Sequence, residues 1–300
     1  MRRRVLAAAF VVGLVVGAIP TLLITANAGP NVDPYRGLGA WVDVFDYVPA
    51  FRGAGPPAVS VETIEDLAVL GAETVYLQAA IDDERSKGLL ADRKLVGQIL
   101  ERAHDVGMRV VAWYYPQLVT PARDLHRVEA LADFRWRGHR FDSIALDIES
   151  RLVPDVTERN ARLVQLAQET RRLSGERSVG AIVYPAVQME VVNPNLWPNF
   201  PYVELAPHID VWLPMAYWTY REAPYHDAYV YTEESVTRLR ANLGDEGAAV
   251  HPIGGLGELS TPEDYVKLVQ AAQAVAALGW SIYDADTTKT TGWAHLQEPG

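Results

Sequence analysis

Residues 74–79 read TVYLQA, residues 94–106 read KLVGQILERAHDV and residues 109–115 read RVVAWYY. The first and third stretches are short and apolar on both faces, as parallel strands covered by helices require. The middle stretch has apolar residues at helical spacing and ends just before Gly107, a residue type that often follows a helix. The three stretches therefore predict a strand, a helix and a second, parallel strand.

The same alternation of apolar run, polar loop and amphipathic segment continues along the chain from residue 37. Eight apolar runs can be counted, at Leu38–Phe45, Thr74–Ala79, Arg109–Tyr115, Ser143–Ile148, Val179–Tyr184, Val211–Ala216, Ala248–Ile253 and Trp280–Asp284. Eight such units in roughly 250 residues fit a closed barrel better than an open doubly wound sheet. No Gly-x-Gly-x-x-Gly follows the first run, which disfavours a nucleotide-binding fold. We therefore predict a (β/α)₈ TIM barrel over residues 37–300.

The first 28 residues have the features of an export signal. Three arginines, Arg2 to Arg4, precede an almost unbroken apolar run from Val5 to Ile24, and Ala26-Asn27-Ala28 resembles a cleavage site. About 20 apolar residues are also enough to cross a bilayer, so both a cleaved signal peptide and a transmembrane anchor fit the sequence. The positive-inside rule places residue 29 onward outside the cytoplasm. Residues 29–36 are interpreted as a linker, and the protein as extracellular or anchored to the outer face of the cytoplasmic membrane.

Composition narrows the class of function. The chain has 300 residues, 49% of them hydrophobic, which is enough to bury a large core and excludes a disordered protein. Its net charge of −11 argues against a nucleic-acid partner, because binding phosphates needs a basic face. It has no cysteine, which excludes disulfides, thiolate nucleophiles and cysteine-based metal sites. A neutral substrate such as a polysaccharide or oligosaccharide fits better.

Two acids end the fourth apolar run. Side chains alternate along a strand, so Ala145, Asp147 and Glu149 share one face, and that face can point into the barrel. Barrel enzymes place their active sites at the carboxyl ends of the strands. Repulsion and partial burial raise the pKa of at least one of two adjacent carboxyl groups, which suits a general acid. We therefore predict that Asp147 and Glu149 form the centre of the site.

This run resembles the signature Asp-Gly-x-Asp-x-Asp-x-Glu of family-18 glycoside hydrolases, the chitinase-like enzymes. The matching residues are Asp142-Ser143-Ile144-Ala145-Leu146-Asp147-Ile148-Glu149. Ser143 replaces the glycine, and Ala145 replaces an acid that in the family helps to hold and tune the next one. Met215-Ala216-Tyr217 is similar to the family's Met-x-Tyr on the sixth strand, although Trp218 stands where an aspartate often follows. Tyr283 and Asp284 match the last strand, with Tyr283 in place of a tryptophan.

The resemblance implies hydrolysis of N-acetylhexosamine-containing glycans, chitin-like or peptidoglycan, by a retaining, substrate-assisted mechanism. Glu149 would be the general acid, Asp147 would orient the sugar's 2-acetamido group, and Tyr217 would donate a hydrogen bond to it. No metal and no other cofactor is needed. The predicted substrate-binding residues lie at strand ends, namely Met215, Trp218, Tyr283, Tyr115, Tyr184, Gln78 and Asp284.

Two alternatives remain open. Many retaining barrel glycosidases set an acid on the fourth strand against a nucleophile on the seventh, with the carboxyl groups about 5 Å apart. Glu258 follows the seventh run and is the alternative nucleophile to pair with Glu149. The second alternative is a catalytically weakened barrel that binds glycans at the cell wall, motivated by the missing acid at Ala145.

Overall fold

Eight parallel strands form the centre of the computed structural model, which describes residues 30–53 and 55–297. They are β1 (Gly37–Val42), β2 (Thr74–Ala80), β3 (Arg109–Tyr114), β4 (Ser143–Ile148), β5 (Val179–Val183), β6 (Val211–Pro214), β7 (Ile253–Leu256) and β8 (Gly279–Tyr283). Their order in the sheet is β6-β5-β4-β3-β2-β1-β8-β7. Parallel bridges between Trp212 and Val250 and between Met215 and Ile253 join β6 to β7. The sheet therefore closes on itself, and the prediction of a (β/α)₈ barrel is confirmed.

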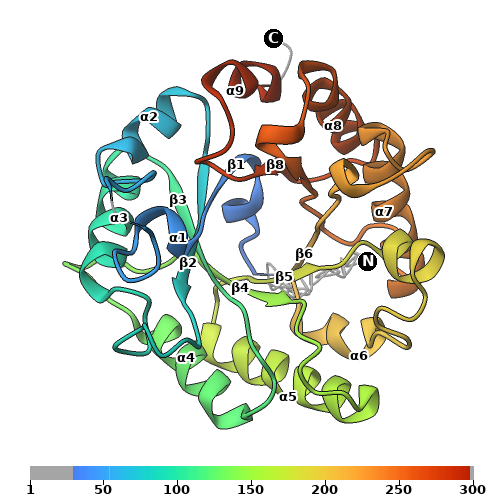
Figure 1. Ribbon diagram of the computed structural model, residues 1–300. Helices are drawn as coiled ribbons and strands as arrows, with labels where there is room; N and C mark the ends of the chain where they lie inside the picture. The colour runs from blue at the N-terminus through green and yellow to red at the C-terminus, as the bar shows by residue number, and fades with distance from the viewer. Residues whose placement is uncertain (1–29, 54, 298–300) are drawn as a thin grey trace, which may run out of the picture.

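Helices surround the strands on the outside of the barrel, apart from the short α1, which comes just after the end of β1 (Figure 1). They are α1 (Val44–Tyr47), α2 (Thr63–Val69), α3 (Arg93–Asp105), α4 (Pro121–Asp133), α5 (Val156–Ser174), α6 (Tyr202–Leu205), α7 (Ala228–Leu243), α8 (Pro262–Ala274) and α9 (Thr290–Leu296). Short helical turns lie at η1 (Asp33–Tyr35), η2 (Gln188–Val192), η3 (Ala206–His208), η4 (Trp218–Tyr220) and η5 (Gly257–Leu259). Several helices begin at an aspartate whose side chain accepts hydrogen bonds from backbone N–H groups, as Asp92 does for Lys94 and Leu95 of α3. This explains why the amphipathic segments start where they do.

Alternation along the strands divides the apolar residues into two layers. One face of each strand packs against the helices and contributes to the larger core. The other face, together with Tyr35 of η1, fills the barrel with a separate cluster, made of Tyr35, Trp41, Tyr76, Val111, Trp113, Ala145, Ile182, Val211, Leu213, Met215 and Ile253. The inside of the barrel is thus a packed core below the strand ends, and a site can open only above it.

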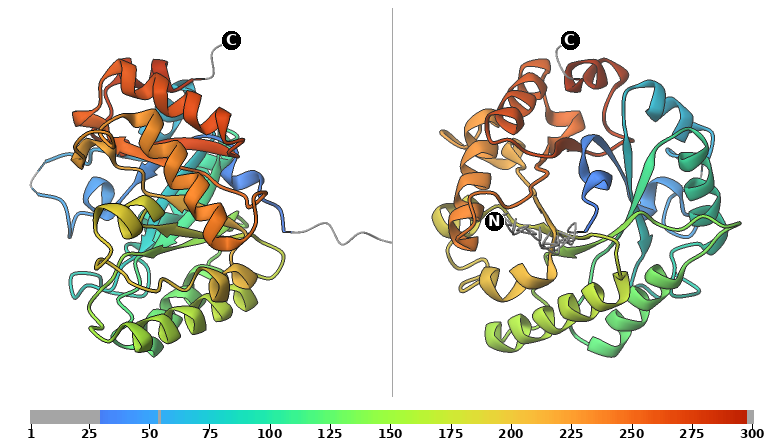
Figure 2. Two further views of the ribbon diagram at one scale, coloured as in Figure 1. Left: turned by 90° about the vertical axis from the view of Figure 1, so that its right-hand side faces the viewer. Right: turned by 180° about the vertical axis from the view of Figure 1, so that it is seen from behind.

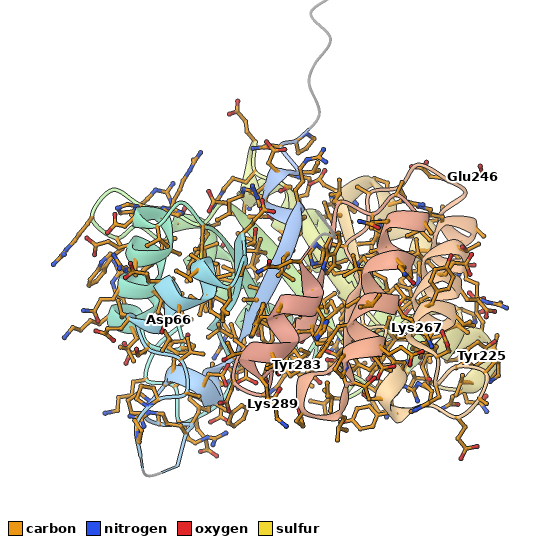
Figure 3. The ribbon with its side chains drawn as sticks, turned by 90° about the horizontal axis from the view of Figure 1, so that it is seen from above. Asp66, Tyr225, Glu246, Lys267, Tyr283 and Lys289 are labelled. Carbon is orange, nitrogen blue, oxygen red and sulfur yellow. The ribbon has the colours of Figure 1, made fainter. Side chains whose placement is uncertain are left out.

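The amino end of the barrel is closed by η1. Tyr35 is fully buried there, and its hydroxyl lies 2.6 Å from Ser143 Oγ at the start of β4. Residues 33–35, which the sequence assigns to a linker, are therefore part of the folded domain. Figures 2 and 3 show the first described residues leaving the barrel at this end; in Figure 3, Glu246 is labelled on the same side, and Tyr283 and Lys289 lie towards the opposite side.

The seventh strand differs from its prediction. The apolar run Ala248–Ile253 suggested a strand, but β7 begins only at Ile253. Pro252 has no backbone N–H and cannot donate to a strand ladder, which explains the late start. The next two residues, Gly254 and Gly255, have to be glycines because Trp218 packs against them. A Cβ atom would lie 2.7 Å from the Trp218 ring at Gly254 and 2.9 Å from it at Gly255.

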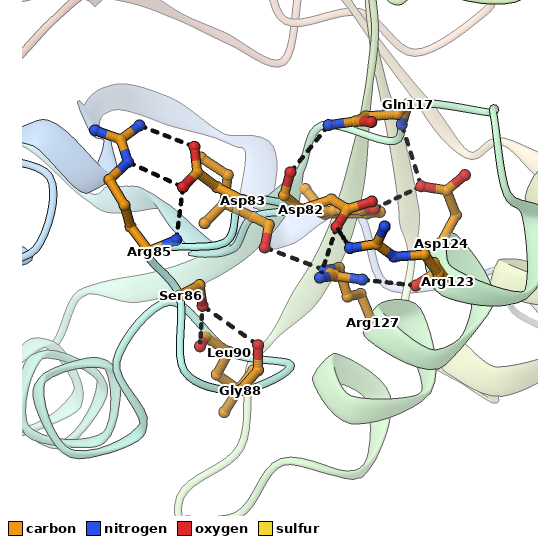
Figure 4. A network of polar contacts seen from close by, with 12 residues as sticks. Asp82, Asp83, Arg85, Ser86, Gly88, Leu90, Gln117, Arg123, Asp124 and Arg127 are labelled. Carbon is orange, nitrogen blue, oxygen red and sulfur yellow. Dashed lines mark hydrogen bonds and ion pairs between the residues drawn. The ribbon is translucent and has the colours of Figure 1, made fainter.

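A hydrogen-bonded loop follows β2 near the carboxyl ends of the strands (Figure 4). The buried carboxylate of Asp82 pairs with Arg123 at 2.6 Å and with Arg127 at 2.8 Å, both from α4. Gln117, after β3, donates to the backbone oxygen of Asp82 at 2.9 Å. These bonds tie the ends of β2 and β3 to α4, so this side of the barrel mouth is held in place.

Among the residues that the structure describes, no helix is long and apolar enough to cross a membrane. The predicted signal or anchor, residues 1–28, lies outside the described residues.

Candidate active site

Two carboxyl groups lie side by side at the carboxyl end of β4. Asp147 is 7% exposed and its Oδ1 atom has no hydrogen-bond partner within residues 30–53 and 55–297. Glu149 directly follows the strand and is partly buried. Its backbone oxygen accepts a hydrogen bond of 3.3 Å from the Tyr184 hydroxyl at the end of β5. The alternation predicted from the sequence therefore places both acids on the interior face.

Burial and mutual repulsion govern the charge of this pair. Burial raises the pKa of Asp147 well above its usual range, and the charge of Glu149 raises it further. Burial also raises the pKa of Glu149, while the neighbouring Asp147 and Tyr184 side chains act in the opposite direction. Two carboxylates so close in a dry environment cannot both be ionised at low cost, so the pair retains a proton at pH values where a free acid has lost it. A retained proton is what a general acid needs.

Tyr217 completes the polar part of the site. It lies three residues after the end of β6. Burial together with the charges of Glu149 and Asp147 raises the pKa of Tyr217 well above its usual range. Its phenol therefore stays protonated and can donate a hydrogen bond. The two acids and this phenol lie in one cavity of about 260 Å³, whose walls are formed by Trp41, Trp113, Asp147, Glu149, Ile182, Met215, Tyr217, Tyr220, Ile253, Leu256 and Tyr283.

A larger hollow of about 730 Å³ lies on the outer wall, between the segment after α1, the loop before α3 and the end of α4. None of the predicted site residues lines it. Its size alone does not make it the site, because neither Asp147 nor Glu149 nor Tyr217 lines it.

The other predicted residues are divided between the cavity and its surroundings. Met215 and Tyr283 line the cavity. Tyr184 contacts Glu149 as described above. Burial raises the pKa of Tyr115, and the charge of Glu149 raises it further.

Four predicted residues lie elsewhere. Trp218 is 1% exposed and packs against β7 rather than facing the cavity, because the chain turns into η4 at this residue and the strand alternation ends. Gln78 is buried and accepts a hydrogen bond from the backbone N–H of Val44 at 3.0 Å. Glu258 is exposed in η5 and does not line the cavity that contains Glu149. Asp284 is buried beside Asp43 and Asp46.

Sequence reasoning missed the aromatic lining at the bottom of the cavity. Trp41 and Trp113 occupy interior positions of β1 and β3, and both line the cavity. Their strand parity could have been used to find them, since Trp41 alternates with the outward residues Ala40 and Val42. Tyr220 also lines the cavity from η4 and is 60% exposed at its rim.

Three carboxyl groups gather next to the cavity. Oxygen atoms of Asp43, Asp46 and Asp284 lie within 4.8 Å of one another, so these are the residues that offer the geometry of a cation site in the described part of the chain. Each also has hydrogen-bond donors within the protein. The Tyr283 hydroxyl donates to Asp43 at 2.7 Å, the backbone N–H of Asp43 donates to Asp46 at 2.9 Å, and the Thr287 N–H donates to Asp284 at 2.9 Å. The cluster thus holds the cavity residue Tyr283 in place through the hydrogen bond to Asp43.

Replacing Asp46 with asparagine should remove a pH dependence of stability. Burial and the nearby Asp43 raise the pKa of Asp46 from 3.8 to about 8. Between these values the folded protein holds a proton that the unfolded chain has lost, so this group's contribution to stability falls as pH rises. The asparagine side chain stays neutral and can still accept from the Asp43 N–H. In urea titrations, the stability of Asp46→Asn relative to wild type should increase from about pH 4 to about pH 8 and then level off.

The matched control is Asp264→Asn. Asp264 occupies the same position in the capping box of α8, where it accepts from the Thr261 N–H at 2.9 Å, but it lies outside the acidic cluster. If the two variants show the same dependence on pH, Asp46 is not protonated in the folded protein.

No protein-family model and no curated protein matches this sequence. Solved structures with a similar fold include a class V chitinase from Pseudomonas fluorescens Pf-5, with a TM-score of 0.61 and 9% identity over 87% of this chain and 98% of that one. The spore cortex-lytic enzyme SleL of Bacillus cereus has a TM-score of 0.61 and 9% identity, over 87% of this chain and 73% of that one. A glycoside hydrolase family 18 N-acetylglucosaminidase from Paenibacillus barengoltzii has a TM-score of 0.57 and 10% identity, over 87% of this chain and 98% of that one. The chain therefore has a chitinase-like (β/α)₈ barrel.

Proposed function

We propose that this protein is an exported glycoside hydrolase acting on glycans that contain N-acetylhexosamine, chitin-like or peptidoglycan. The observation that carries the proposal is the meeting of Asp147, Glu149 and Tyr217 in one cavity at the carboxyl ends of the strands. The names of the structural neighbours, chitinases and an N-acetylglucosaminidase among them, support the same substrate class.

The three side chains suit a substrate-assisted mechanism. Glu149 gives its proton to the glycosidic oxygen as the bond from that oxygen to the anomeric carbon breaks. The carbonyl oxygen of the sugar's own acetamido group attacks the anomeric carbon, with Asp147 stabilising the positive charge and Tyr217 donating to the acetamido oxygen. Water then opens this cyclic intermediate, and the Glu149 carboxylate takes the proton from that water. The anomeric configuration is retained, and the protein supplies no nucleophile, unlike in the usual two-carboxylate scheme.

The acetamido group gives this proposal a direct test. Oligosaccharides of β-linked N-acetylglucosamine should be cleaved, with the β-anomer formed first when the products are followed by NMR. Cello-oligosaccharides of the same length lack the acetamido group and should not be cleaved. Cleavage of both series would instead favour Glu258, or another carboxylate, as nucleophile. Binding of the N-acetylated series without any turnover would favour the glycan-binding module, for which Ala145 is the motivating residue.

The proposal includes export, which rests on the arginines and apolar run of residues 2–24 and on the Ala-x-Ala pattern before residue 29. Both the cleaved and the anchored form place the barrel outside the cytoplasm. Protease should reach the domain in cells that have a permeabilised outer layer and an intact cytoplasmic membrane. Protection of the domain until the cytoplasmic membrane is lysed would contradict export.

A further inference from the structure

We propose that His104 and His139 together bind a divalent transition-metal ion at the amino end of the barrel, and that Asp142 holds His104 in the orientation that ligation needs. His104 lies in the last turn of α3, His139 in the loop before β4, and Asp142 directly precedes β4. The acid pair lies at the other end of β4. A metal site at the amino end goes beyond the proposed function and does not depend on it.

The two imidazole rings face each other through their Nδ1 atoms. These atoms are 2.9 Å apart, and the ring centroids are 5.1 Å apart with planes at 45°. Two nitrogen atoms with this separation, each about 2.0–2.1 Å from one ion, subtend an angle of about 90° at the ion. Neighbouring ligands of a square-planar or octahedral ion meet at this angle. The separation therefore fits two adjacent ligands on one ion.

Asp142 determines which nitrogen of His104 is free to bind. Its Oδ2 atom lies 3.0 Å from His104 Nε2 and accepts a hydrogen bond of 2.7 Å from the backbone N–H of Val110. A carboxylate only accepts, so Nε2 carries the ring proton and Nδ1 presents its lone pair to His139. Histidines that bind a metal through one nitrogen usually donate through the other to a carboxylate, a carbonyl or water. Asp142 is therefore a positioning residue for this site.

A tight hairpin holds the backbone of His139. Trp136 and His139 exchange backbone hydrogen bonds of 3.1 and 2.8 Å. The two residues between them, Arg137 and Gly138, have φ angles of 47° and 91°. Positive φ at both positions is the conformation of a two-residue hairpin turn that favours glycine second. The loop before β4 is therefore ordered by its own sequence.

The hairpin is docked on the helix that carries His104. The Trp136 ring packs against Gly97 of α3, where a Cβ atom would lie 2.2 Å from the ring. The Trp136 N–H donates to Glu101 of α3 at 2.9 Å. Glu101 and His104 are three residues apart and so lie on one face of the helix. These contacts place His139 opposite His104 before any ion binds.

One proton has to move when the ion binds. His104 Nδ1 accepts, so the hydrogen between the two rings belongs to His139 Nδ1. The ion occupies the place of this hydrogen, and His139 carries its ring proton on Nε2 instead. Both imidazoles stay neutral, which is the form in which histidine binds metals.

Nitrogen ligands decide the class of ion. Imidazole suits Zn²⁺, Ni²⁺ and Cu²⁺, whereas Mg²⁺ and Ca²⁺ prefer oxygen ligands such as those of the carboxyl cluster Asp43, Asp46 and Asp284. An angle of about 90° between the ligands favours Cu²⁺ or Ni²⁺ over tetrahedral Zn²⁺. Cu²⁺ binds most tightly of these ions to a given set of nitrogen and oxygen ligands. Two histidines leave the remaining positions on the ion to water.

Calorimetry with Cu²⁺ alone as the probe tests the site. The full-length protein is purified in detergent without a histidine tag, because a tag would bind the same ion. Wild type should bind one ion with Kd on the order of 1 µM. His104→Gln and His139→Gln each remove one nitrogen ligand and should raise Kd by about tenfold or more, ~1.4 kcal/mol. The matched control is His126→Gln, which changes an exposed histidine of α4 and should leave Kd unchanged.

Electron paramagnetic resonance of the bound Cu²⁺ identifies its ligands, because the unpaired electron couples to each bound nitrogen. Wild type should show coupling to two imidazole nitrogens, and His104→Gln or His139→Gln to one at most. Asp142→Asn keeps an oxygen that can accept from Val110 and His104 but removes the charge. This variant should raise Kd by about tenfold and keep the two-nitrogen spectrum. If Asp142 only maintained the local fold, a loss of affinity would be accompanied by loss of that spectrum.

The outcomes decide each part of the proposal. Failure of wild type to bind Cu²⁺ overturns the site, and so does an equal Kd for wild type and a His104→Gln variant shown to be folded by its urea transition. The two histidines would then serve only to join α3 to the hairpin. An Asp142→Asn variant that binds Cu²⁺ as tightly as wild type overturns the positioning role. The proposed function is tested separately, by cleavage of the N-acetylated oligosaccharides.

Discussion

Replacing Glu149 with glutamine is expected to lower the rate of glycan hydrolysis by roughly 10² to 10⁴-fold while binding persists. Glutamine keeps the shape of the side chain and its hydrogen bonds but has no proton to give to the leaving oxygen. The loss should appear in kcat, with Kd for tri-N-acetylchitotriose close to that of wild type. Initial rates of reducing-end release, with binding followed by calorimetry, measure both quantities.

Glu258→Gln is the matched control for this substitution. Glu258 is exposed and does not line the cavity, so its replacement should leave the rate unchanged in a substrate-assisted reaction. A fall in rate as large as that of Glu149→Gln would assign Glu258 the role of nucleophile. Equal rates for Glu149→Gln and wild type would exclude Glu149 as the acid.

Restoring the missing acid with Ala145→Asp is expected to destabilise the protein by several kcal/mol without raising its activity. Ala145 is fully buried on β4 and pairs in register with Trp113 of β3 and Gly180 of β5. The Trp41 N–H is bonded to Ser281, and the Trp113 N–H donates to the Tyr76 oxygen at 3.1 Å. Neither is free to stabilise a new carboxylate, and Asp147 lies two residues away on the same face. The new acid would therefore be desolvated and repelled.

Unfolding in urea, read as the free energy of unfolding, tests this expectation. Ala145→Asn has nearly the same shape without the charge and separates the cost of charge from the cost of volume. The penalty of Ala145→Asp relative to Ala145→Asn should shrink as pH falls, because protonation removes the charge. A variant as stable as wild type and faster would show that the barrel tolerates the family's full set of acids.

The strands and the acid pair could be predicted because both depend on local alternation. Short apolar runs give the strands almost to the residue, as at Ser143–Ile148, and parity along β4 puts Asp147 and Glu149 on one face. Where local chemistry interrupts the alternation, prediction failed: Pro252 delays β7, and the turn η4 carries Trp218 away from the cavity.

The floor of the cavity could not be predicted in the same way. Trp41 acquires its place from Tyr76, Ser281 and His251, which are distant in sequence and meet only when β1 pairs with β2 and β8. A tryptophan inside an apolar strand is indistinguishable from a core residue until that pairing is known. The same holds for the closeness of Asp43, Asp46 and Asp284, since the third acid comes from the other end of the chain.

Because η1 closes one end of the barrel, the point where the chain enters the domain and the opening of the cavity lie at opposite ends. The chain enters the domain at the end plugged by Tyr35, and the cavity opens at the other end, beyond Tyr283 (Figure 3). In the anchored form proposed above, the tether would attach to the back of the barrel and the mouth would point outward from the bilayer. An insoluble polymer outside the cell would then reach Asp147 and Glu149 directly, without having to enter the space between the protein and the lipid surface.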